Sequence, residues 1–252
     1  MIKRIVGNIL KKLGYQISIT NFKKPFELDV EEEFKDIFFK TKPYTMTSLS
    51  RLYSFYKATQ YVIDNNIPGD IVECGVWKGG SMMASALTLM NKNNAQKQLF
   101  LYDTYEGMSA PTEKDKPLIS KRDTLDKWKE MQSEGFNEWC YSPLEEVQKN
   151  LYSTNYPKEK ITFIKGKVEE TIPNIIPEKI SILRLDTDWY ESTYHELMHL
   201  FPRLSKGGVL IIDDYGHWKG SREAVDKYLK ENEISMLLNR IDYTGRIGVK
   251  VF

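Results

Sequence analysis

The stretch Gly69-Asp70-Ile71-Val72-Glu73-Cys74-Gly75-Val76-Trp77-Lys78-Gly79-Gly80-Ser81 decides how the rest of the chain is organised. A short apolar run ends in the acidic Glu73, and glycines at three positions precede a run rich in Met, Ala and Leu that begins at Ser81. This order predicts a strand, a tight turn and the start of a helix. Such a turn lets backbone approach a ligand, and the helix start favours an anion such as a phosphate or a carboxylate. Glycines also serve packing alone, so the turn by itself does not establish a site.

Strand and helix patterns alternate on both sides of this turn. Short apolar runs predict further strands at 99–102, 161–164, 180–185 and 209–212, and a closing hairpin at 235–241 and 246–251. Apolar residues recur at helical spacing over 48–66, 81–90, 143–151, 192–204 and 222–229. This alternation predicts an α/β fold with a doubly wound, mostly parallel seven-stranded sheet.

Length and composition limit the classes of function. A chain of 252 residues suits one domain with additions, and its 36 basic and 35 acidic residues nearly cancel. We therefore expect no nucleic-acid partner that is held by overall charge. The two cysteines, Cys74 and Cys140, form no CxxC motif and fit a reducing cytosol, so we expect a cytoplasmic protein. No apolar run approaches the roughly 20 residues that a membrane span needs.

The N-terminal part, residues 1–45, is predicted to be a helical and irregular extension. Residues 1–14 form a basic amphipathic pattern with one apolar face, made of Ile2, Ile5, Ile9 and Leu13. Such a helix packs on its own domain or on a second subunit, or it contacts an anionic membrane surface at the inner face. Residues 15–47 are expected to be an irregular lead-in to the main domain, residues 46–252. Within that domain the charged and aromatic segment 106–141 has no place in a minimal sheet and is predicted to form a lid.

The strands of the predicted sheet end in carboxylates or glycines, at the edge where ligands bind in doubly wound folds. Asp103 ends the second strand, where a carboxylate can accept hydrogen bonds from ribose hydroxyls. It can equally serve as a turn residue in Asp-Thr-Tyr-Glu-Gly. Gly166 follows the third strand and is expected at the same edge.

Four aspartates follow the next two strands. Asp186 and Asp188 lie two residues apart, so their side chains point to one side, and Asp213 and Asp214 end the following strand. Four neighbouring carboxylates repel one another unless a cation or a proton lies among them. Oxygen ligands without sulfur or imidazole suit Mg²⁺, or else Mn²⁺ or Ca²⁺. Three carboxylates would hold the metal and the fourth would accept a proton. In the alternative interpretation some of them cap helices or pair with arginines, namely Arg184, Arg203 and Arg222.

The loop after Asp214 contains candidate substrate contacts. His217 lies three residues beyond Asp214 in a loop with a glycine, at the predicted edge of the site. Tyr215 and Trp218 either line the same rim or simply pack. These residues are therefore candidates for contact with a substrate.

With these residues the chain resembles the macrocin O-methyltransferase family of S-adenosylmethionine-dependent class I methyltransferases. The matching stretches are Met46-Thr47-Ser48-Leu49-Ser50-Arg51-Leu52, Glu73 to Ser81, Asp103-Thr104-Tyr105-Glu106-Gly107-Met108, Arg184 to Thr193, Pro202 to Gly208, Asp213-Asp214-Tyr215-Gly216, and Gly220 to Asp226. Their order and spacing span roughly residues 44–230, and residues 1–40 fall outside the resemblance.

The resemblance implies a Rossmann-like enzyme that transfers a methyl group to a hydroxyl, usually on a sugar of a natural-product glycoside, with Mg²⁺ and S-adenosylmethionine. It implies that the metal ligands are Asp186, Asp213 and Asp214 and that the general base is Asp188. It places the cofactor against Glu73, Gly75, Ser81 and Asp103, with Gly166 at the neighbouring strand end and Thr47 reaching over from the preceding helix. It also implies a homo-oligomer.

Other interpretations of the sequence stay open. Asp186-Thr187-Asp188 is also an Asp-x-Asp motif, with which a metal-dependent glycosyltransferase would hold a nucleotide sugar. An NAD-dependent dehydrogenase would need a middle glycine that this turn lacks. A nucleotide-binding module without turnover is the third alternative. The sequence leaves the acceptor open among free glycans, nucleotide-linked or lipid-linked sugars, and antibiotics.

Overall fold

The computed structural model describes residues 29–119 and 123–252 of the chain. Contacts divide the chain after Glu32, and the second unit, Glu33–Phe252, contains the sheet and the helices that cover it. The amphipathic helix predicted at residues 1–14 lies outside the described residues. No helix in the described part of the chain combines the length and the apolar character needed to cross a bilayer.

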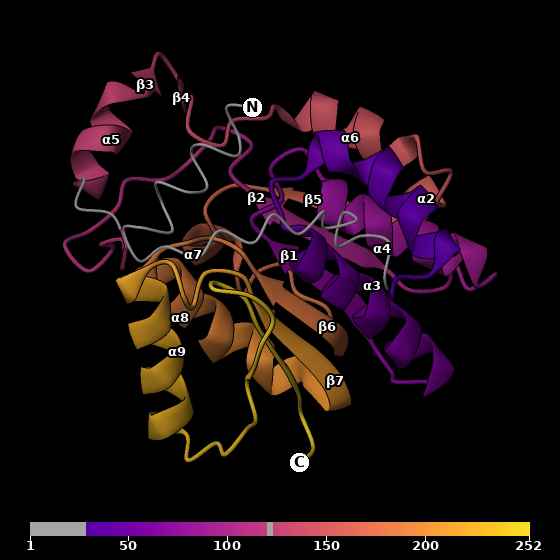
Figure 1. Cartoon of the computed structure of the whole chain (residues 1–252). Helices are drawn as coiled ribbons and strands as arrows, with labels where there is room; N and C mark the ends of the chain where they lie inside the picture. Colours follow the sequence, from indigo (N-terminus) through magenta and orange to yellow (C-terminus); the bar gives the residue numbers. More distant parts are fainter. Residues whose placement is uncertain (1–28, 120–122) are drawn as a thin grey trace, which may run out of the picture. The chain divides into compact units, whose positions relative to one another are not determined.

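The predicted seven-stranded sheet is present (Figure 1). Its strands, in sheet order, are β5 (Ile161–Lys165), β2 (Leu99–Asp103), β1 (Asp70–Cys74), β6 (Ile180–Leu185), β7 (Leu204–Ile212), β9 (Arg246–Val249) and β8 (Asn239–Arg240). The five strands from β5 to β7 are parallel, and β9 and β8 pair antiparallel at the end of the sheet. Successive strands run outward from β1 to β5 and then return to β6 on the other side of β1. The crevice between β1 and β6 is therefore the switch point where such sheets bind ligands.

Helices cover both faces of the sheet, as a doubly wound fold requires (Figure 1). One core packs α3 (Leu49–Asp64), α4 (Gly80–Asn91) and α6 (Leu144–Tyr152) against strand residues such as Ile71 and Ile182. The other packs α7 (Val168–Thr171), α8 (Tyr190–Leu200) and α9 (Lys219–Glu231) against residues such as Val72 and Leu183. Because side chains alternate along a strand, neighbouring residues of β1 and β6 serve opposite cores.

The lead-in to the domain differs from the expectation of an irregular segment. Residues Glu32–Thr41 form helix α2, which is followed by the short 3-10 turn Lys42–Tyr44. Phe34, Ile37 and Thr41 recur on one face and are buried, and the ring of Phe34 lies 5.1 Å from that of Tyr56 on α3. The charged residues between these positions make the helical spacing of the buried residues hard to recognise in the sequence. Burial of this face against α3 is what stabilises the helix.

The segment 106–141 inserts a small substructure between β2 and α6. It contains α5 (Thr124–Glu130) and a short hairpin of β3 (Gln132–Ser133) and β4 (Phe136–Asn137). The remaining 3-10 turns are Lys158–Lys160 and Phe201–Arg203. The closing hairpin is present but shorter than predicted, because β8 has only two residues.

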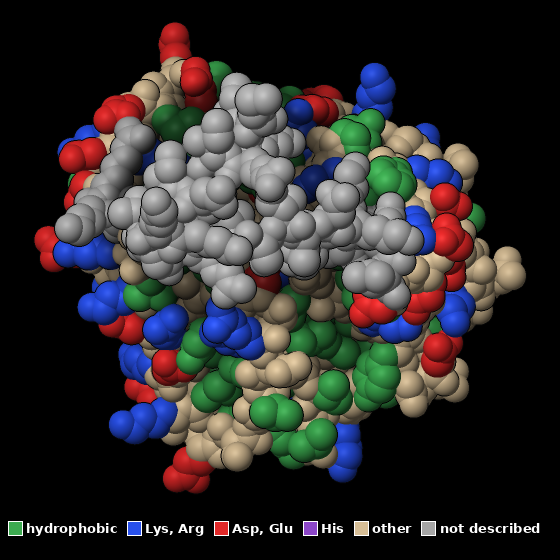
Figure 2. Space-filling view, in the orientation of Figure 1, with side chains coloured by type: hydrophobic (Ala, Val, Ile, Leu, Met, Phe, Trp, Pro, Cys, Tyr) green, Lys and Arg blue, Asp and Glu red, His purple; other side chains and the backbone are tan. Residues whose placement is uncertain are grey.

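Charges of both signs are interspersed on the face shown in Figure 2, and neither sign dominates it. This agrees with the formal net charge of +1. Recognition of a ligand must therefore come from the local arrangement of side chains in the site.

Candidate active site

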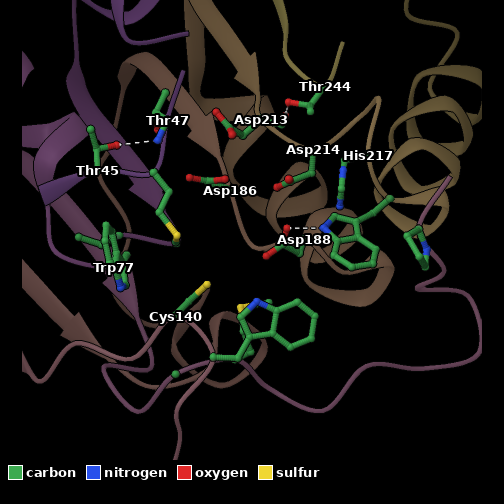
Figure 3. A pocket seen from close by; sticks show the side chains of 18 of the residues that line it. Thr45, Thr47, Trp77, Cys140, Asp186, Asp188, Asp213, Asp214, His217 and Thr244 are labelled. Atoms are coloured by element: carbon green, nitrogen blue, oxygen red, sulfur yellow. Dashed lines mark hydrogen bonds between the residues drawn. The ribbon is translucent and has the colours of Figure 1, made fainter. Parts of the chain in front are cut away.

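A cavity of about 570 Å³ opens at the switch point between β1 and β6. It is lined by the glycine turn, by the start of α3, by residues that follow β6 and β7, and by the insertion (Figure 3). Pockets for small molecules and cofactors commonly have volumes of about 300–1,000 Å³. The space beside Gly75 is thus open and large enough for a cofactor together with part of an acceptor.

Packing against the protein explains the glycines of the turn. A Cβ on Gly75 would lie 2.0 Å from the carbonyl oxygen of Asp186, and one on Gly80 would lie 2.5 Å from that of Tyr44. Gly79 has a φ of 86° and starts α4 from a left-handed conformation. The glycines therefore bring β1, β6 and α4 close together, and in doing so they place the backbone at the cavity wall.

The residues expected to bind the cofactor lie in different layers of the site. Thr47, Gly75, Ser81 and Asp103 line the main cavity. Gly166 lies in a small adjoining cavity, of about 60 Å³, that also contacts Gly75 and Asp103. Glu73 is fully buried and is absent from both walls.

Asp103 performs the turn role that its sequence context allowed. Its Oδ2 accepts hydrogen bonds from the backbone N–H groups of Val76 (2.6 Å) and Trp77 (3.1 Å), and its Oδ1 accepts one from Tyr105 (2.7 Å). Burial raises the pKa of this carboxyl, and the three N–H donors oppose that shift. Asp103 thus fixes the glycine turn and still forms part of the cavity wall.

Glu73 and Arg184 form a buried ion pair beneath the turn. They are aligned in the parallel register of β1 and β6, so their side chains meet on the same face of the sheet. The Arg184 guanidinium also donates to Thr47 Oγ1 (3.2 Å) and lies 2.8 Å from Asp186 Oδ2. Burial raises the pKa of Glu73 to about 7, although the charge of Arg184 opposes the shift.

The structure brings together the three aspartates predicted to hold a metal. Asp186, Asp213 and Asp214 each present a carboxylate oxygen within 4.8 Å of the others (Figure 3). Asp213 contacts two arginines, because Arg184 Nη2 donates to its Oδ1 (2.7 Å) and Arg51 Nη1 contacts its Oδ2. The sequence allowed two interpretations of these aspartates, a shared cation or pairing with arginines such as Arg184. Both therefore concern the same cluster of carboxylates.

The cluster fits a hard divalent cation. Its donors are all carboxylate oxygens, which Mg²⁺ prefers. Asp214 Oδ2 is buried and has no hydrogen-bond partner among the described residues. Burial and the charges of Asp188 and Asp186 raise the pKa of Asp214 well above its usual range. A buried acceptor without a partner, beside two further carboxylates, is the arrangement that a cation would satisfy.

Asp188 lies next to this cluster, at the same end of the sheet (Figure 3). It has a φ of 69°, a left-handed conformation that aspartate tolerates better than most residues. Its Oδ1 accepts a 2.5 Å hydrogen bond from Trp218 Nε1. Burial, followed by the charge of Asp186, raises its pKa to about 7.

Of the candidate substrate contacts, Trp218 lines the cavity and so does His217. Its Nδ1 lies 3.3 Å from the hydroxyl of Tyr243, and burial lowers its pKa. Tyr215 is absent from the cavity wall, and its hydroxyl donates to Asp226 on α9. The insertion contributes Met108, Trp139 and Cys140 to the wall, which agrees with its expected position over the site.

A family model for macrocin O-methyltransferase matches residues 9–248, almost the whole chain. The chain belongs to the macrocin O-methyltransferase family. Its curated relatives include demethyldecarbamoylnovobiocin O-methyltransferase from Streptomyces niveus, which is 28% identical over 97% of this chain and 89% of the relative. Another is 8-demethyl-8-(2,3-dimethoxy-alpha-L-rhamnosyl)-tetracenomycin-C 4'-O-methyltransferase from Streptomyces olivaceus, at 30% identity over the same shares. Mycinamicin III 3''-O-methyltransferase from Micromonospora griseorubida is 28% identical over 97% of this chain and 92% of the relative.

Solved structures confirm the fold of this macrocin O-methyltransferase family member. The O-methyltransferase NovP superposes with a TM-score of 0.72 at 29% identity, covering 83% of both chains. The calicheamicin methyltransferase CalS11 superposes with a TM-score of 0.58 at 17% identity, covering 93% of this chain and 99% of the other, and shows the fold alone. The Rossmann-like class I methyltransferase fold expected from the sequence is therefore confirmed, and the chain is an O-methyltransferase.

Sequence reasoning missed several residues of this family member's site. Arg51 lies in a stretch that carries the family resemblance, and yet its contact with Asp213 was not anticipated. The sequence indicates Arg184 only as a partner for the aspartates in the interpretation without a metal. A charged residue inside the buried run Ile180–Leu185 was the signal that could have identified it.

Proposed function

We propose that this O-methyltransferase uses S-adenosylmethionine and Mg²⁺ to methylate a hydroxyl of a sugar, in a glycan or a glycosylated natural product. The observation that carries the proposal is the convergence of four aspartates at the ends of β6 and β7, in a cavity that continues to the glycine turn. This arrangement supports a cofactor site and an acidic site side by side in one cavity.

We propose that the cofactor lies against Gly75 and Ser81, with Thr47 and Asp103 on either side. These residues line one cavity, and the N-terminus of α4 presents free backbone N–H groups there. The carboxylate end of the cofactor's methionine part suits such a helix N-terminus. Gly166, in the adjoining small cavity, extends this surface. Glu73 would contribute from behind, through Arg184 and the turn.

The proposed metal ligands are Asp186, Asp213 and Asp214. When bound, Mg²⁺ would supply Lewis-acid chemistry, which polarises an oxygen and lowers the pKa of a hydroxyl. The three aspartates have fixed positions, because each follows a strand of the sheet. They form the side of the cavity that we propose for the acceptor. Arg184 holds Asp186 and Asp213 in place from below.

Asp188 is the proposed general base. A sugar hydroxyl ionises far above neutral pH, so it must lose its proton as its oxygen bonds to the methyl carbon and the bond from that carbon to the sulfur breaks, which would release S-adenosylhomocysteine. The carboxylate of Asp188 would take this proton, and its pKa of about 7 is close to the operating pH, which favours proton transfer. The acceptor oxygen must then lie in line with the methyl group and the sulfur, a geometry that the rigid strand ends favour.

The sugar acceptor is proposed on the basis of the relatives' names. One relative is named for a methyl transfer to a position of a rhamnosyl group, and another for a 3''-O-methyl transfer on mycinamicin III. The aromatic side chains on the acceptor side, Trp139 and Trp218, suit the apolar face of a sugar ring. Family membership favours this activity over the alternative glycosyltransferase that would use Asp186-Thr187-Asp188.

Binding measurements test the proposal without knowledge of the acceptor. We expect S-adenosylhomocysteine to bind in calorimetry, and a UDP-sugar and NAD to show no comparable affinity, with or without Mg²⁺. Mg²⁺ should bind the wild-type protein and fail to bind Asp214→Asn. Asp64→Asn, at an exposed position on α3, is the matched control and should keep the ion. Preferential binding of the UDP-sugar would overturn the methyltransferase proposal.

The variant Asp188→Asn tests the base. We expect it to keep its affinity for S-adenosylhomocysteine and for Mg²⁺, and to lose on the order of 10²–10⁴-fold in turnover, the usual contribution of a general base. Asparagine tolerates the left-handed backbone of this position, so the fold should persist. The measurement is methyl transfer from radiolabelled S-adenosylmethionine to a panel of rhamnosides. Unchanged turnover would remove Asp188 as the base.

Location and assembly complete the proposal. We propose a cytoplasmic homo-oligomer whose basic N-terminal segment contacts a partner subunit or an anionic membrane face, as the charge pattern of residues 1–14 suggests. Flotation with anionic vesicles, compared between the full chain and a chain lacking residues 1–24, tests the membrane contact. Equal behaviour of the two proteins would exclude it.

A further inference from the structure

The indole of Trp218 donates a hydrogen bond to the carboxylate of Asp188. The distance from Nε1 to Oδ1 is 2.5 Å, and the dashed line at Asp188 in Figure 3 marks this bond. Charge-assisted hydrogen bonds of this kind are shorter and stronger than neutral ones. The sequence alone left open whether Trp218 lines the rim or simply packs.

Contacts on several sides fix the Trp218 side chain, so its indole N–H points in one direction. Its backbone N–H donates to Asp214 O (3.0 Å), and its backbone pairs with Pro117 of the insertion in an isolated β-bridge. Its ring lies 5.0 Å from that of Trp189 and 6.1 Å from that of Trp139. The side chain is 7% exposed, which leaves it little freedom to turn.

Asp188 needs such a partner. The terminal torsion of an aspartate side chain is broad, so sequence and backbone alone do not fix the plane of its carboxylate. Asp188 lies in a left-handed turn after β6, outside the sheet that fixes the strand residues. A strong donor on one oxygen fixes this plane and leaves the other lone pairs directed at a substrate.

We propose that Trp218 is a positioning residue, whose indole N–H sets the orientation in which Asp188 receives the proton of the acceptor hydroxyl. The inference rests on the proposed function, because it assumes that Asp188 is the base. Trp218 acts through its hydrogen bond to Asp188. Its own position is fixed because its backbone pairs with Pro117 of the insertion and because it is the N-cap residue of α9. The insertion thereby contributes to the geometry of the base as well as to the cavity wall.

The chain offers a matched control in the same aromatic cluster. Trp189 also donates its indole N–H, but to the carbonyl oxygen of Ser109 (3.0 Å), and it is not among the residues that line the cavity. Trp218→Phe and Trp189→Phe therefore each remove one indole donor and keep an aromatic ring. Only the first removes a donor from the base.

Nuclear magnetic resonance of the indole N–H groups tests the bond directly, in the full chain and without an acceptor. The chain has five tryptophans, and the resonance of Trp218 is assigned as the one missing from Trp218→Phe. We expect this resonance to be strongly downfield and to move upfield in Asp188→Asn, while that of Trp189 stays in place. A Trp218 resonance that does not move in Asp188→Asn would overturn the inference. If Trp218→Phe fails to fold, nuclear Overhauser contacts with the rings of Trp139 and Trp189 assign the resonance instead.

Kinetics test the consequence, with the rhamnoside that gives the highest methyl transfer as acceptor. Trp218→Phe should lower kcat by at least about tenfold, since a misplaced catalytic group costs this much or more. KM for the acceptor and the affinity for S-adenosylhomocysteine should stay within about twofold, and Trp189→Phe should keep wild-type kcat. An equal loss in both variants, or wild-type kcat in Trp218→Phe, would contradict the positioning role. Wild-type turnover in Asp188→Asn would instead show that the proposed base is wrong, which is a separate outcome.

Discussion

Arg184 shows how one buried residue joins the two halves of the site. It is 2% exposed and contacts Glu73 on the cofactor side and Asp186 and Asp213 on the acidic side. Removal of one partner from a buried ion pair leaves an uncompensated charge, which commonly costs about 3–5 kcal/mol. The planar guanidinium offers five N–H donors in a fixed geometry, which suits contact with several carboxylates at once.

Glu196 is another buried carboxyl, close to the turn that carries Asp186 and Asp188. It comes from α8, is fully buried, and its Oε1 accepts a hydrogen bond from Thr187 Oγ1 (2.9 Å). Its Oε2 has no hydrogen-bond partner among the described residues. Burial raises the pKa of Glu196 well above its usual range, so the folded protein holds the proton more tightly than the unfolded chain does.

The variant Glu196→Gln should reveal this proton in the free energy of unfolding. Because the pKa is raised on folding, the native state binds more protons above about pH 4.5, and wild-type stability falls as the pH rises through this window. Glutamine stays neutral, so the stability of the variant relative to wild type should rise by up to about 1.4 kcal/mol per pH unit, from pH 4.5 to the pH at which Glu196 ionises in the folded protein. Urea unfolding between pH 4.5 and pH 7 measures the difference.

Glu159→Gln, at an exposed position, serves as the control for this series. Its stability relative to wild type should stay constant across the same pH range. A stability difference for Glu196→Gln that does not depend on pH would mean that Glu196 is ionised in the folded protein.

At the scale of elements, the start of α8 receives its cap from the insertion. Trp189, the N-cap residue, has no side-chain hydrogen bond to the helix start. Asp115 supplies one instead, because its Oδ1 accepts from the backbone N–H of Tyr190 (2.8 Å) and its Oδ2 from Thr112 (2.8 Å). A Cβ on Gly220 would lie 2.2 Å from Asp115 Oδ1, which explains the glycine at the start of α9.

Asp115→Ala should loosen the insertion. It leaves the N–H groups of Tyr190 and Thr112 without their partner, so we expect a loss of about 1–3 kcal/mol in unfolding free energy. Amide exchange should speed up at Leu118, whose N–H is bonded to His217 O across the same junction (2.8 Å). Asp64→Ala, which breaks an exposed ion pair with Lys92, is the control and should change stability by less than about 1 kcal/mol. Unchanged exchange at Leu118 would show that other contacts hold the segment.

The sequence predicts those parts of the site whose positions follow from the geometry of parallel strands. Parallel strands end at one edge and side chains alternate along them, so the meeting of Asp186, Asp213 and Asp214 follows from the pattern. The side chains of Glu73 and Tyr215 could not be placed in this way. The partner of Glu73 depends on the register between β1 and β6, and the direction of Tyr215 depends on packing against α9, and both are long-range properties.

Acidic side chains outnumber basic ones on the wall of the assembled cavity, which no single motif reveals. Six aspartates line it, namely Asp103, Asp123, Asp186, Asp188, Asp213 and Asp214. Its lysine and arginine side chains, among the described residues, are Arg51 and Lys127. Charges interact more strongly inside a protein cavity than in bulk water, so these side chains affect the binding of a charged ligand.

This imbalance predicts how Mg²⁺ changes the choice between cofactor and product. S-adenosylmethionine carries a sulfonium charge that S-adenosylhomocysteine lacks, so without a divalent ion the acidic cavity should bind S-adenosylmethionine more tightly. Mg²⁺ at Asp186, Asp213 and Asp214 would neutralise part of this field and should reduce the preference by about tenfold, or about 1.4 kcal/mol. Calorimetry with both ligands, in EDTA and in Mg²⁺, measures the two ratios. In Asp214→Asn the ratio should no longer respond to Mg²⁺, and a wild-type ratio that is the same under both conditions would place the ion outside the reach of the cofactor.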